Sequence, residues 1–534
     1  MAGNSARSLS VAVSLSVVAL LAVPTASVAE DVKPFKVTAA KVVSGPIPST
    51  ATSYAYIMDG VGVALPVPDG YVEEEYFISG KGNIYEFTAT GIRVVDPCPA
   101  AATLGCKDVP WVTRMIVKRP RHPHQFSGTV IIEPLNATGG FDIAGVWDRS
   151  RHYFVRNGDI FVGWTAKSVT VNMLKTWDPT RYADLSWPYA PFAGQTNNSP
   201  LDGITFDAAS QVGALFRTNG PDSPIHAYKV KHVFETGFSQ DGGYTFTQAL
   251  VFHDLARMPD GGPIYDGYVP GGTTGPSNIN FGLTTNGAYT TATGKLPQMG
   301  PRSAPVIHVN TESEVLLVSR LGYRRPDGDA ANDRYRLWEV PGASHISNDL
   351  RDAVIALQLN DVETHRTDPS KLEPIGCTHM EFTDGPVTGL PGIVDPNDYP
   401  FAYVENAAFF WLTRWVETGK APPHADFITT DAVGVVRDVN GNALGGVRTP
   451  FVDVPITTFT PFDTVAFKTT FSAFCGIYGY NTLFPEAKLQ TFYRNHGGYV
   501  MRFVLGTAKV LEHGFWLMPD AVDAIQRAVH ADVP

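Results

Sequence analysis

The feature that most constrains the fold is a short turn in residues 232–250, HVFETGFSQDGGYTFTQAL. An apolar run typical of a β-strand comes before the turn, and the composition after it favours a helix. Ser239 lies at the apex between the two. A tight turn of this kind holds a serine in a strained backbone conformation, lifts its hydroxyl clear of the sheet and points the next N–H at the same place. The segment therefore predicts a nucleophile elbow between a strand and a helix.

The turn departs at one position from the common pattern G-x-S-x-G. Asp241 occupies the place of the second glycine, and Gly242 and Gly243 follow one place later. A glycine- and serine-rich loop that caps a helix would explain the same residues without any chemistry. The rest of the chain has to decide between the two interpretations.

Apolar strands alternate with helical segments through most of the chain, and this alternation indicates the fold class. Residues 37–134 are rich in strand patterns separated by turns, which predicts a mainly antiparallel start. Strands are then expected at residues 159–166, 232–236, 264–269, 304–310 and 334–340, and helices at 206–217, 405–418, 499–513 and 519–530. Strand alternating with helix predicts an α/β fold with a doubly wound, mostly parallel sheet after a strand-rich N-terminal part.

Three long segments do not fit the alternation: residues 168–200, 271–300 and 365–461. Long irregular segments in a compact domain are usually functional, as lids or binding loops. We expect one catalytic domain over residues 30–534 with lid-like insertions at about these three places.

The first 29 residues have the organisation of a secretory signal peptide. Arg7 precedes an apolar stretch over residues 11–23, and Ser27 and Ala29 form a small-x-small cleavage site. The apolar stretch is too short to span a bilayer. We therefore expect an exported protein, secreted or periplasmic, with no membrane association.

Export permits disulfide bonds, and the chain has four cysteines. Three pairings are possible. The short loop between Cys98 and Cys106 favours a bridge between these two, which leaves Cys377 to pair with Cys475. The chain has no Cys-x-x-Cys motif, so zinc or redox chemistry has little support, and no metal or cofactor is implied.

The charge balance disfavours two classes of partner. The chain carries 41 basic and 52 acidic residues, a net charge of −11, and its Lys and Arg residues form no cluster. Electrostatic capture of nucleic acid or of an anionic membrane is therefore disfavoured.

A serine hydroxyl is a poor nucleophile near neutral pH, so it needs an imidazole to take its proton and a carboxylate to orient that imidazole. In the α/β-hydrolase arrangement these groups follow successive strands in the order serine, acid, histidine. The chain has that order: Ser239, then Glu312 and Glu314 after one predicted strand, then His345 after the next. Three matches in order, each at a strand end, favour the catalytic interpretation of the turn.

The sequence leaves both glutamates open as the acid. Residues two apart face the same way while a segment stays extended, so alternation does not choose between them. In the common pattern the strand is followed by Gly-x-x-Asp, and alignment on it puts Thr311 at the glycine and Glu314 at the acid. This alignment favours Glu314, with Glu312 close enough to share hydrogen bonds with the loop.

Ester hydrolysis also needs an oxyanion hole, made of two N–H donors. Gln240 follows the serine and is expected to supply one from its backbone. The second should come from the turn after the strand in residues 128–140, GTVIIEPLNATGG, from Asn136 or Ala137. The sequence Asn136-Ala137-Thr138 is also a glycosylation sequon, so a plain polar turn is the alternative.

Several motifs together resemble a known family. VIIEPLNATGG, ETGFSQDGG, IYDGYVPGG, VNTESEV, LWEVPGASH and DVNGNALGGVRTP are similar to the large exported α/β-hydrolase-domain proteins of bacteria, most of them uncharacterised and assumed to be esterases. The resemblance covers residue 37 to the C-terminus. It implies an α/β-hydrolase fold, with the family's serine and histidine at Ser239 and His345 and its acid at Glu312 or Glu314. The family has a small residue at the position of Asp241.

The hypothesis from the sequence is a secreted serine hydrolase that cleaves a small-molecule or polymeric carboxylic ester through an acyl-enzyme intermediate. The same triad also opens amides, so a peptidase or amidase is one alternative. A catalytically silent binding protein with the same fold is the other.

Overall fold

The computed structural model describes residues 31–50, 53–54, 67–98, 105–188, 200–280, 298–316, 318–346, 395–462 and 473–534. The predicted signal peptide and the predicted Cys377–Cys475 bridge lie outside the described residues. The predicted insertions lie partly outside them.

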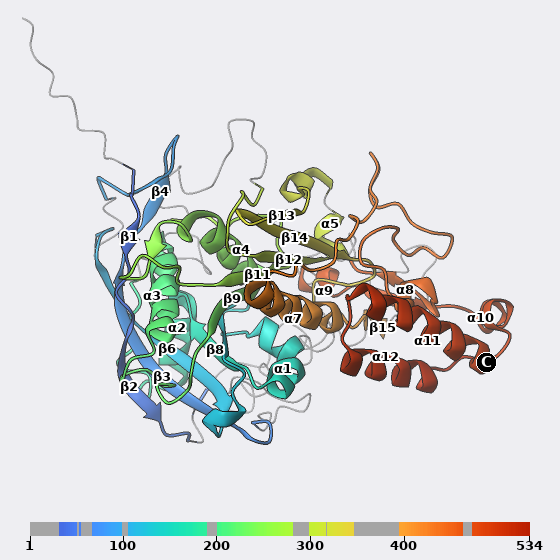
Figure 1. Cartoon of the computed structure of the whole chain (residues 1–534), viewed down its shortest axis with the longest axis horizontal. Helices are drawn as coiled ribbons and strands as arrows, with labels where there is room; N and C mark the ends of the chain where they lie inside the picture. The colour runs from blue at the N-terminus through green and yellow to red at the C-terminus, as the bar shows by residue number, and fades with distance from the viewer. Residues whose placement is uncertain are drawn as a thin grey trace, which may run out of the picture.

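A ten-stranded sheet forms the centre of the molecule (Figure 1). Its strands, in spatial order, are β13 (Gly328–Ala330), β14 (Asp333–Val340), β12 (Val306–Thr311), β11 (Gly267–Gly271), β9 (His232–Phe238), β7 (Thr129–Leu135), β8 (Ile160–Thr165), β6 (Val109–Pro120), β3 (Tyr71–Gly82) and β2 (Lys41–Ile47). The six strands from β14 to β8 are parallel, and β13, β6, β3 and β2 add antiparallel pairs at the two sides. The predicted α/β class, mostly parallel sheet and antiparallel start are confirmed.

Helices cover both faces of this sheet because its strands are apolar on both sides. In β7, Val130 and Ile132 belong to one buried cluster and Ile131 to the other. The first face packs against α2 (Ser168–Trp177), α3 (Thr205–Thr218) and α4 (Gln240–Thr247). The second packs against α1 (Gly145–Asn157) and α7 (Ala402–Thr418). The result is a three-layer sandwich.

The order of the strands creates a topological switch point in the sheet. From β7 the chain passes through α1 to β8 on one side of β7, and then through α2 and α3 to β9 on the other side. The direction of winding therefore reverses between β7 and β9. In open α/β sheets, ligands bind at the carboxyl ends of the strands at such a switch point.

Smaller elements complete the described chain. Two short pairs are β1 (Phe35–Lys36) with β10 (Ala256–Arg257) and β4 (Tyr85–Phe87) with β5 (Ile92–Val94). The single-turn helices and the π-turn are Pro123–Gln125, Pro200–Ile204, Gln248–Phe252, α5 (Glu312–Val315) and Val318–Tyr323. No helix in the described ranges is both long enough and apolar enough to cross a membrane.

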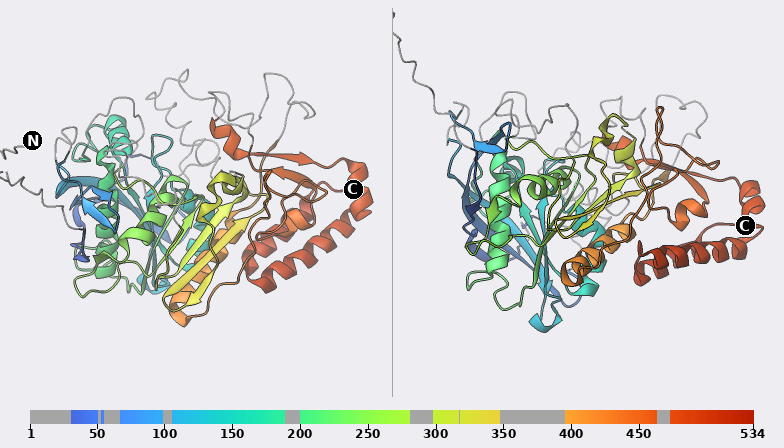
Figure 2. Two further views of the ribbon diagram at one scale, coloured as in Figure 1. Left: turned by 90° about the horizontal axis from the view of Figure 1, so that it is seen from above. Right: turned by 45° about the horizontal axis from the view of Figure 1, so that its top comes forward.

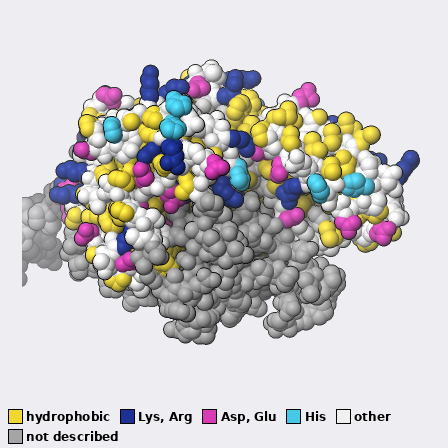
Figure 3. Space-filling model, turned by 90° about the horizontal axis from the view of Figure 1, so that it is seen from below, with side chains coloured by type: hydrophobic (Ala, Val, Ile, Leu, Met, Phe, Trp, Pro, Cys, Tyr) yellow, Lys and Arg dark blue, Asp and Glu magenta, His cyan; other side chains and the backbone are white. Residues whose placement is uncertain are grey.

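The C-terminal part forms a lobe beside the sheet (Figure 2). It contains a small sheet of β15 (Asp395–Pro396), β17 (Tyr480–Leu483) and β16 (Thr457–Thr460), with helices α8 (Pro450–Asp453), α9 (Ala473–Tyr478), α10 (Glu486–Tyr493), α11 (His496–His513) and α12 (Met518–His530). The side chains of Met501 and Leu505 on α11 and of Met518 on α12 are exposed. Figure 3 shows hydrophobic side chains gathered on one face of this lobe.

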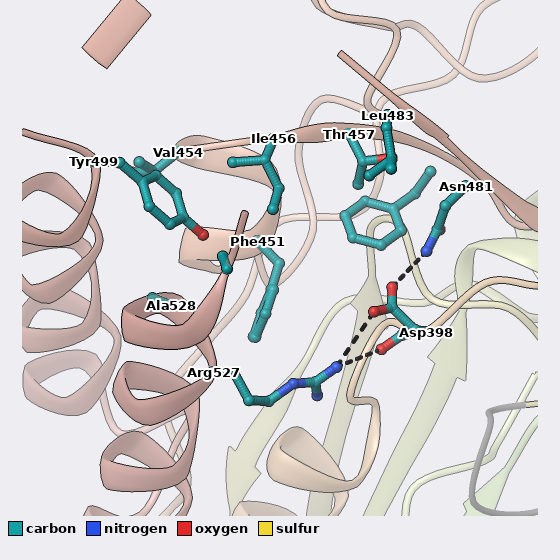
Figure 4. Close-up of a pocket in the computed structure, with 12 residues that line it drawn as sticks. Asp398, Phe451, Val454, Ile456, Thr457, Asn481, Leu483, Tyr499, Arg527 and Ala528 are labelled. Atoms are coloured by element: carbon teal, nitrogen blue, oxygen red, sulfur yellow. Dashed lines mark hydrogen bonds and ion pairs between the residues drawn. The ribbon is translucent and has the colours of Figure 1, made fainter. Parts of the chain in front are cut away.

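A hollow in this lobe is lined by the aromatic side chains of Phe451, Phe459 and Tyr499 and by polar groups (Figure 4). Its polar groups already pair with one another, because Asp398 accepts hydrogen bonds from Asn481 at 2.5 Å and from Arg527 at 3.4 Å. None of the predicted site residues lines the hollow.

Helices lie within two of the three segments that depart from the alternation. In residues 168–200, Ser168–Trp177 forms α2, which buries Val171 and Leu174 against the sheet. In residues 365–461, the helix predicted at 405–418 is present as α7, Ala402–Thr418, which contacts β11 and β12 from the other face. The sequence around α2 is rich in Trp, Tyr, Pro and Asn, and this composition hid its helical spacing.

Candidate active site

Ser239 joins β9 to α4 in a strained conformation. Its backbone has φ 66° and ψ −118°, a region that residues other than glycine rarely adopt. The neighbouring strand stabilises the turn, because the Ser239 N–H donates to the carbonyl oxygen of Gly271 in β11 at 3.0 Å. The geometry is that of the predicted elbow, with the side chain of Ser239 partly exposed.

Two glycines explain why the elbow forms without the common spacing. A Cβ at Gly237 would overlap the backbone carbonyl of Asp241, and a Cβ at Gly242 would overlap the carbonyl oxygen of Gly271. Gly242 therefore lets α4 approach β11 closely. The position between the serine and Gly242 can carry a side chain, and the side chain of Asp241 is fully buried there.

The structure brings together Ser239, His345 and Glu314. His345 lies in the loop after β14, and its Nε2 is 2.7 Å from the Ser239 Oγ. Its Nδ1 is 2.5 Å from Oε1 of Glu314, which lies in α5 after β12. A carboxylate only accepts hydrogen bonds, so Nδ1 carries the proton and Nε2 is free to accept one from the serine. Ser313 Oγ holds the backbone by accepting from the His345 N–H at 2.9 Å.

The surroundings of Glu314 keep it ionised. Its second oxygen, Oε2, accepts hydrogen bonds from the Thr311 N–H at 2.8 Å and the Thr311 hydroxyl at 2.7 Å. Burial acts to raise the pKa of Glu314, but His345 and these hydrogen bonds outweigh it, and the pKa lies below its usual value. The capping box at Thr311 thus leaves one oxygen directed at the imidazole.

Glu312 points away from the imidazole. Its carboxylate accepts from the Gly342 N–H at 2.7 Å and from Arg437 at 2.6 Å. The expectation that both glutamates face the same way assumed an extended segment. They lie in the one-turn helix α5, where residues two apart are rotated by about 200°. Glu312 therefore hydrogen-bonds to the loop that precedes His345, whereas Glu314 contacts the imidazole ring.

Of the two predicted donors at the end of β7, Ala137 is the better candidate. The Asn136 N–H donates to the backbone carbonyl oxygen of Ile143 at 2.9 Å and is engaged in the loop. The Ala137 N–H donates at 3.1 Å to the side-chain oxygen of Gln240, the residue after the serine. The Gln240 N–H is the first of α4, where helical N–H groups have no partner within the helix.

A buried carboxyl group lies directly beneath the elbow. Asp241 Oδ2 accepts from the Phe238 N–H at 2.9 Å, and Oδ1 accepts from the side-chain amide of Asn136 at 2.8 Å. Burial raises the pKa of Asp241 to about 7. Sequence reasoning marked Asp241 only as a departure from a pattern, because its partner Asn136 is 105 residues away.

The arrangement can support acyl transfer. A partly exposed hydroxyl contacts an imidazole, which contacts a carboxylate, and the Ala137 N–H after β7 contacts the side chain of Gln240, the residue after the serine. Among the described residues, no group of histidine, cysteine or acidic side chains is arranged to hold a metal ion.

A family model described as an alpha/beta hydrolase domain matches residues 43–526 of the chain. No curated protein gives a significant sequence match. Many solved structures are similar at low identity. A dienelactone hydrolase from Anabaena variabilis is 12% identical, with 48% of this chain and 92% of that chain covered and a TM-score of 0.25.

Two further solved structures are a variant of the esterase rPPE and a methylesterase. The first is 14% identical, with 57% of this chain and 84% of that chain covered and a TM-score of 0.29. The second is 12% identical, with 64% and 66% covered and a TM-score of 0.27. The family assignment rests on the match over residues 43–526.

Proposed function

We propose that this chain, which belongs to the alpha/beta hydrolase domain family, is a serine hydrolase. It cleaves carboxylic esters through an acyl-enzyme intermediate. The observation that carries the proposal is the continuous contact from Ser239 Oγ to His345 Nε2 at 2.7 Å and from His345 Nδ1 to Glu314 at 2.5 Å. The strained φ of Ser239 adds support, because such strain is typical of nucleophile elbows.

In the first half-reaction Ser239 Oγ attacks the ester carbonyl carbon while His345 Nε2 takes the hydroxyl proton. Glu314 stabilises the resulting imidazolium through its contact with Nδ1. The tetrahedral intermediate collapses when His345 returns the proton to the leaving alcohol oxygen. The serine then carries the acyl group as an ester.

In the second half-reaction a water molecule gives a proton to His345 and attacks the acyl carbon, and Ser239 leaves with the proton restored. The negative oxygen of each intermediate accepts from the N–H groups of Gln240 and Ala137. In the free protein the side-chain oxygen of Gln240 accepts from Ala137, so the substrate oxygen takes the place of a group already held there.

We also propose that the protein is exported after removal of residues 1–29. The organisation of that segment supports export, and so does the disulfide between Cys98 and Cys106, because such bonds persist in oxidising compartments. The predicted absence of nucleic-acid and membrane partners stays a prediction from the charge balance.

A fluorophosphonate probe tests the proposal, because it phosphonylates only an activated serine. Wild-type protein should be labelled and should hydrolyse p-nitrophenyl esters. Ser239→Ala and His345→Ala should each lower turnover by several orders of magnitude without loss of fold. His226→Ala, at an exposed histidine, is the matched control and should match the wild type. Labelling retained in Ser239→Ala would place the nucleophile elsewhere, and an unlabelled wild type would indicate a binding protein.

The substrate class is tested separately with matched p-nitrophenyl esters and peptide p-nitroanilides. The proposal expects kcat/KM for the esters to exceed that for the anilides. The reverse preference would identify the peptidase or amidase alternative with the same residues.

A further inference from the structure

The carboxylate of Asp241 connects two segments that must keep a fixed separation for the proposed reaction. Its Oδ2 accepts from the Phe238 N–H, directly before the serine. Its Oδ1 accepts from the side-chain amide of Asn136, directly before Ala137. The same Asn136 amide also donates to the Phe238 carbonyl oxygen at 3.1 Å. One aspartate thus joins the elbow to the turn that follows β7.

Both the side chain and the backbone of Asn136 are hydrogen-bonded, so a shift of its side chain would also move the backbone. Its side-chain oxygen accepts from the Thr138 N–H at 2.8 Å. Its own N–H and carbonyl form a two-bond bridge with Ile143, each bond 2.9 Å long. Residues 136–143, which we call the oxyanion loop, are therefore closed at the base by this bridge and anchored to the elbow through the amide of Asn136.

Burial of the Asp241 carboxyl group carries a desolvation cost, which an apolar residue or a glycine at this position would not have. Asp241 is fully buried, and Glu133 beneath it is buried too, so that burial and then Asp241 raise the pKa of Glu133. Arg149 contributes positive potential, but its own hydrogen bonds go to Glu405 at 2.8 and 3.0 Å, and it stacks on the Phe238 ring. A glycine, the common residue at this position, would remove the cost.

We infer that Asp241 is a positioning residue that fixes the Ala137 N–H against the elbow by holding Asn136, and so completes the oxyanion hole. The inference rests on the proposed function. Asp241 touches neither substrate nor the reacting atoms. Its effect on the reaction passes through Asn136, so it should appear in turnover more than in substrate affinity, since the oxyanion exists only in the intermediates and transition states.

A double-mutant cycle isolates this link. Asp241→Asn keeps an oxygen for the Phe238 N–H but presents an amide to the Asn136 amide, donor against donor. Asn136→Ala removes the same contact from the other side. Loss of a whole oxyanion donor costs about 10²–10³-fold in kcat, so each single variant should lose about 10–100-fold in kcat and in the rate of fluorophosphonate labelling, with KM within about two-fold. The kcat of the double variant should lie within about two-fold of the kcat of the less active single variant.

Asp207→Asn is the matched control. Asp207 is also a buried aspartate in the first turn of a helix, and its hydrogen bonds come from Asn83 and Tyr85, neither of which belongs to the elbow or to residues 136–143. This variant should lower the melting temperature but leave kcat, KM and the labelling rate unchanged. A merely structural Asp241 would give the same result as the control.

The activity of Asp241→Gly distinguishes a positioning role of Asp241 from a role as a mere substitute for the common glycine. If the aspartate only substitutes for the common glycine, this variant should match or exceed wild-type turnover, and the inference is overturned. If Asp241 positions the loop, turnover should fall. Losses that multiply in the Asp241→Asn, Asn136→Ala double variant would also overturn it. Failure of the proposed function is distinguishable, because then the wild type itself would show neither labelling at Ser239 nor ester hydrolysis.

Discussion

At the scale of single residues, local geometry separates the roles of two neighbouring glutamates. Glu314 contacts His345, whereas Glu312 holds the Gly342 N–H and pairs with Arg437. Both are buried, but their pKa values shift in opposite directions. Burial raises the pKa of Glu312, while His345 and Thr311 hold that of Glu314 below its usual value.

Glu314→Gln should therefore lower kcat by about 10²–10⁴-fold. It removes the charge that supports the imidazolium, and an amide whose oxygen stays with the Thr311 donors presents its NH₂ group to Nδ1 and reverses the tautomer. Glu312→Gln is its matched control. It keeps an acceptor for Gly342 and should lower the melting temperature while kcat stays within about three-fold. Steady-state kinetics with thermal melts of both variants make the comparison. A larger loss of turnover in Glu312→Gln would reverse the assignment.

A second residue, Asp159, contributes to the pH dependence of stability. Asp159 is buried, and burial raises its pKa to about 7, although Ser127 and Asn157 donate hydrogen bonds to it at 2.6 and 2.7 Å. The folded state therefore retains a proton that the unfolded chain releases near pH 4. Stability contributed by this group is present at low pH and is lost as pH rises from about 4 to 7, by about 1.4 kcal/mol per unit of pKa difference at most.

Asp159→Asn removes this titration while keeping an acceptor for Ser127. The variant should gain stability relative to the wild type as pH rises from 4.5 to 7.5, as measured by urea unfolding at several pH values. A stability difference that does not change over that range would show that Asp159 does not titrate there.

At the scale of elements, the site depends on how closely α4 approaches β11. Gly242 faces the Gly271 carbonyl oxygen, and the Ser239 N–H bonds to the same oxygen. The elbow, the helix and the next strand thus meet at one carbonyl. A shift of α4 would move Ser239 relative to His345, since the two come from different strands.

Gly242→Ala should push α4 away from β11, at a cost of about 1–3 kcal/mol in the free energy of unfolding, and should reduce turnover as well. Gly497→Ala provides the contrast, because Gly497 lies in α11 with nothing but the Asn495 side chain near its Cβ position. That variant should gain up to about 1 kcal/mol and keep full activity. Unaltered activity in Gly242→Ala would show that the elbow tolerates movement of the helix.

At the scale of the whole molecule, one of the two predicted disulfide bonds is confirmed. Cys98 and Cys106 are joined, with their Cα atoms 5.6 Å apart. The predicted partner bridge, Cys377–Cys475, lies outside the described residues and stays a prediction.

Replacement of Cys98 and Cys106 by serine should lower the free energy of unfolding by about 2–3 kcal/mol, because the short closed loop restricts the unfolded chain. Ester hydrolysis at 25 °C should not change, since Cys106 bonds to Ile84, which follows β3, and β7, β8 and β6 lie between β3 and the strand that leads to Ser239. Chemical unfolding and peptide mapping under non-reducing conditions are the measurements. Recovery of a peptide that joins Cys98 to Cys377 would contradict both pairings.

The sequence by itself determined the α/β class, and it predicted the turn at Ser239 and the positions of Glu312, Glu314 and His345 directly after later strands. These depend on local patterns: alternation of apolar residues, a small-residue turn, and polar residues directly after strands. Even the preference for Glu314 over Glu312 followed from spacing within one loop, although the reason, a helical turn in α5, did not.

Only the tertiary structure decided which N–H groups and carboxylates act together. Asn136 and Asp241 are 105 residues apart, and the bridge from Asn136 to Ile143 that engages its N–H depends on the path of a loop. The helix α2 was hidden for the same reason, because its stability comes from burial against the sheet more than from its own composition. Contacts between distant segments depend on how the helices pack on the two faces of the sheet, and the local pattern of residues in the sequence does not predict them.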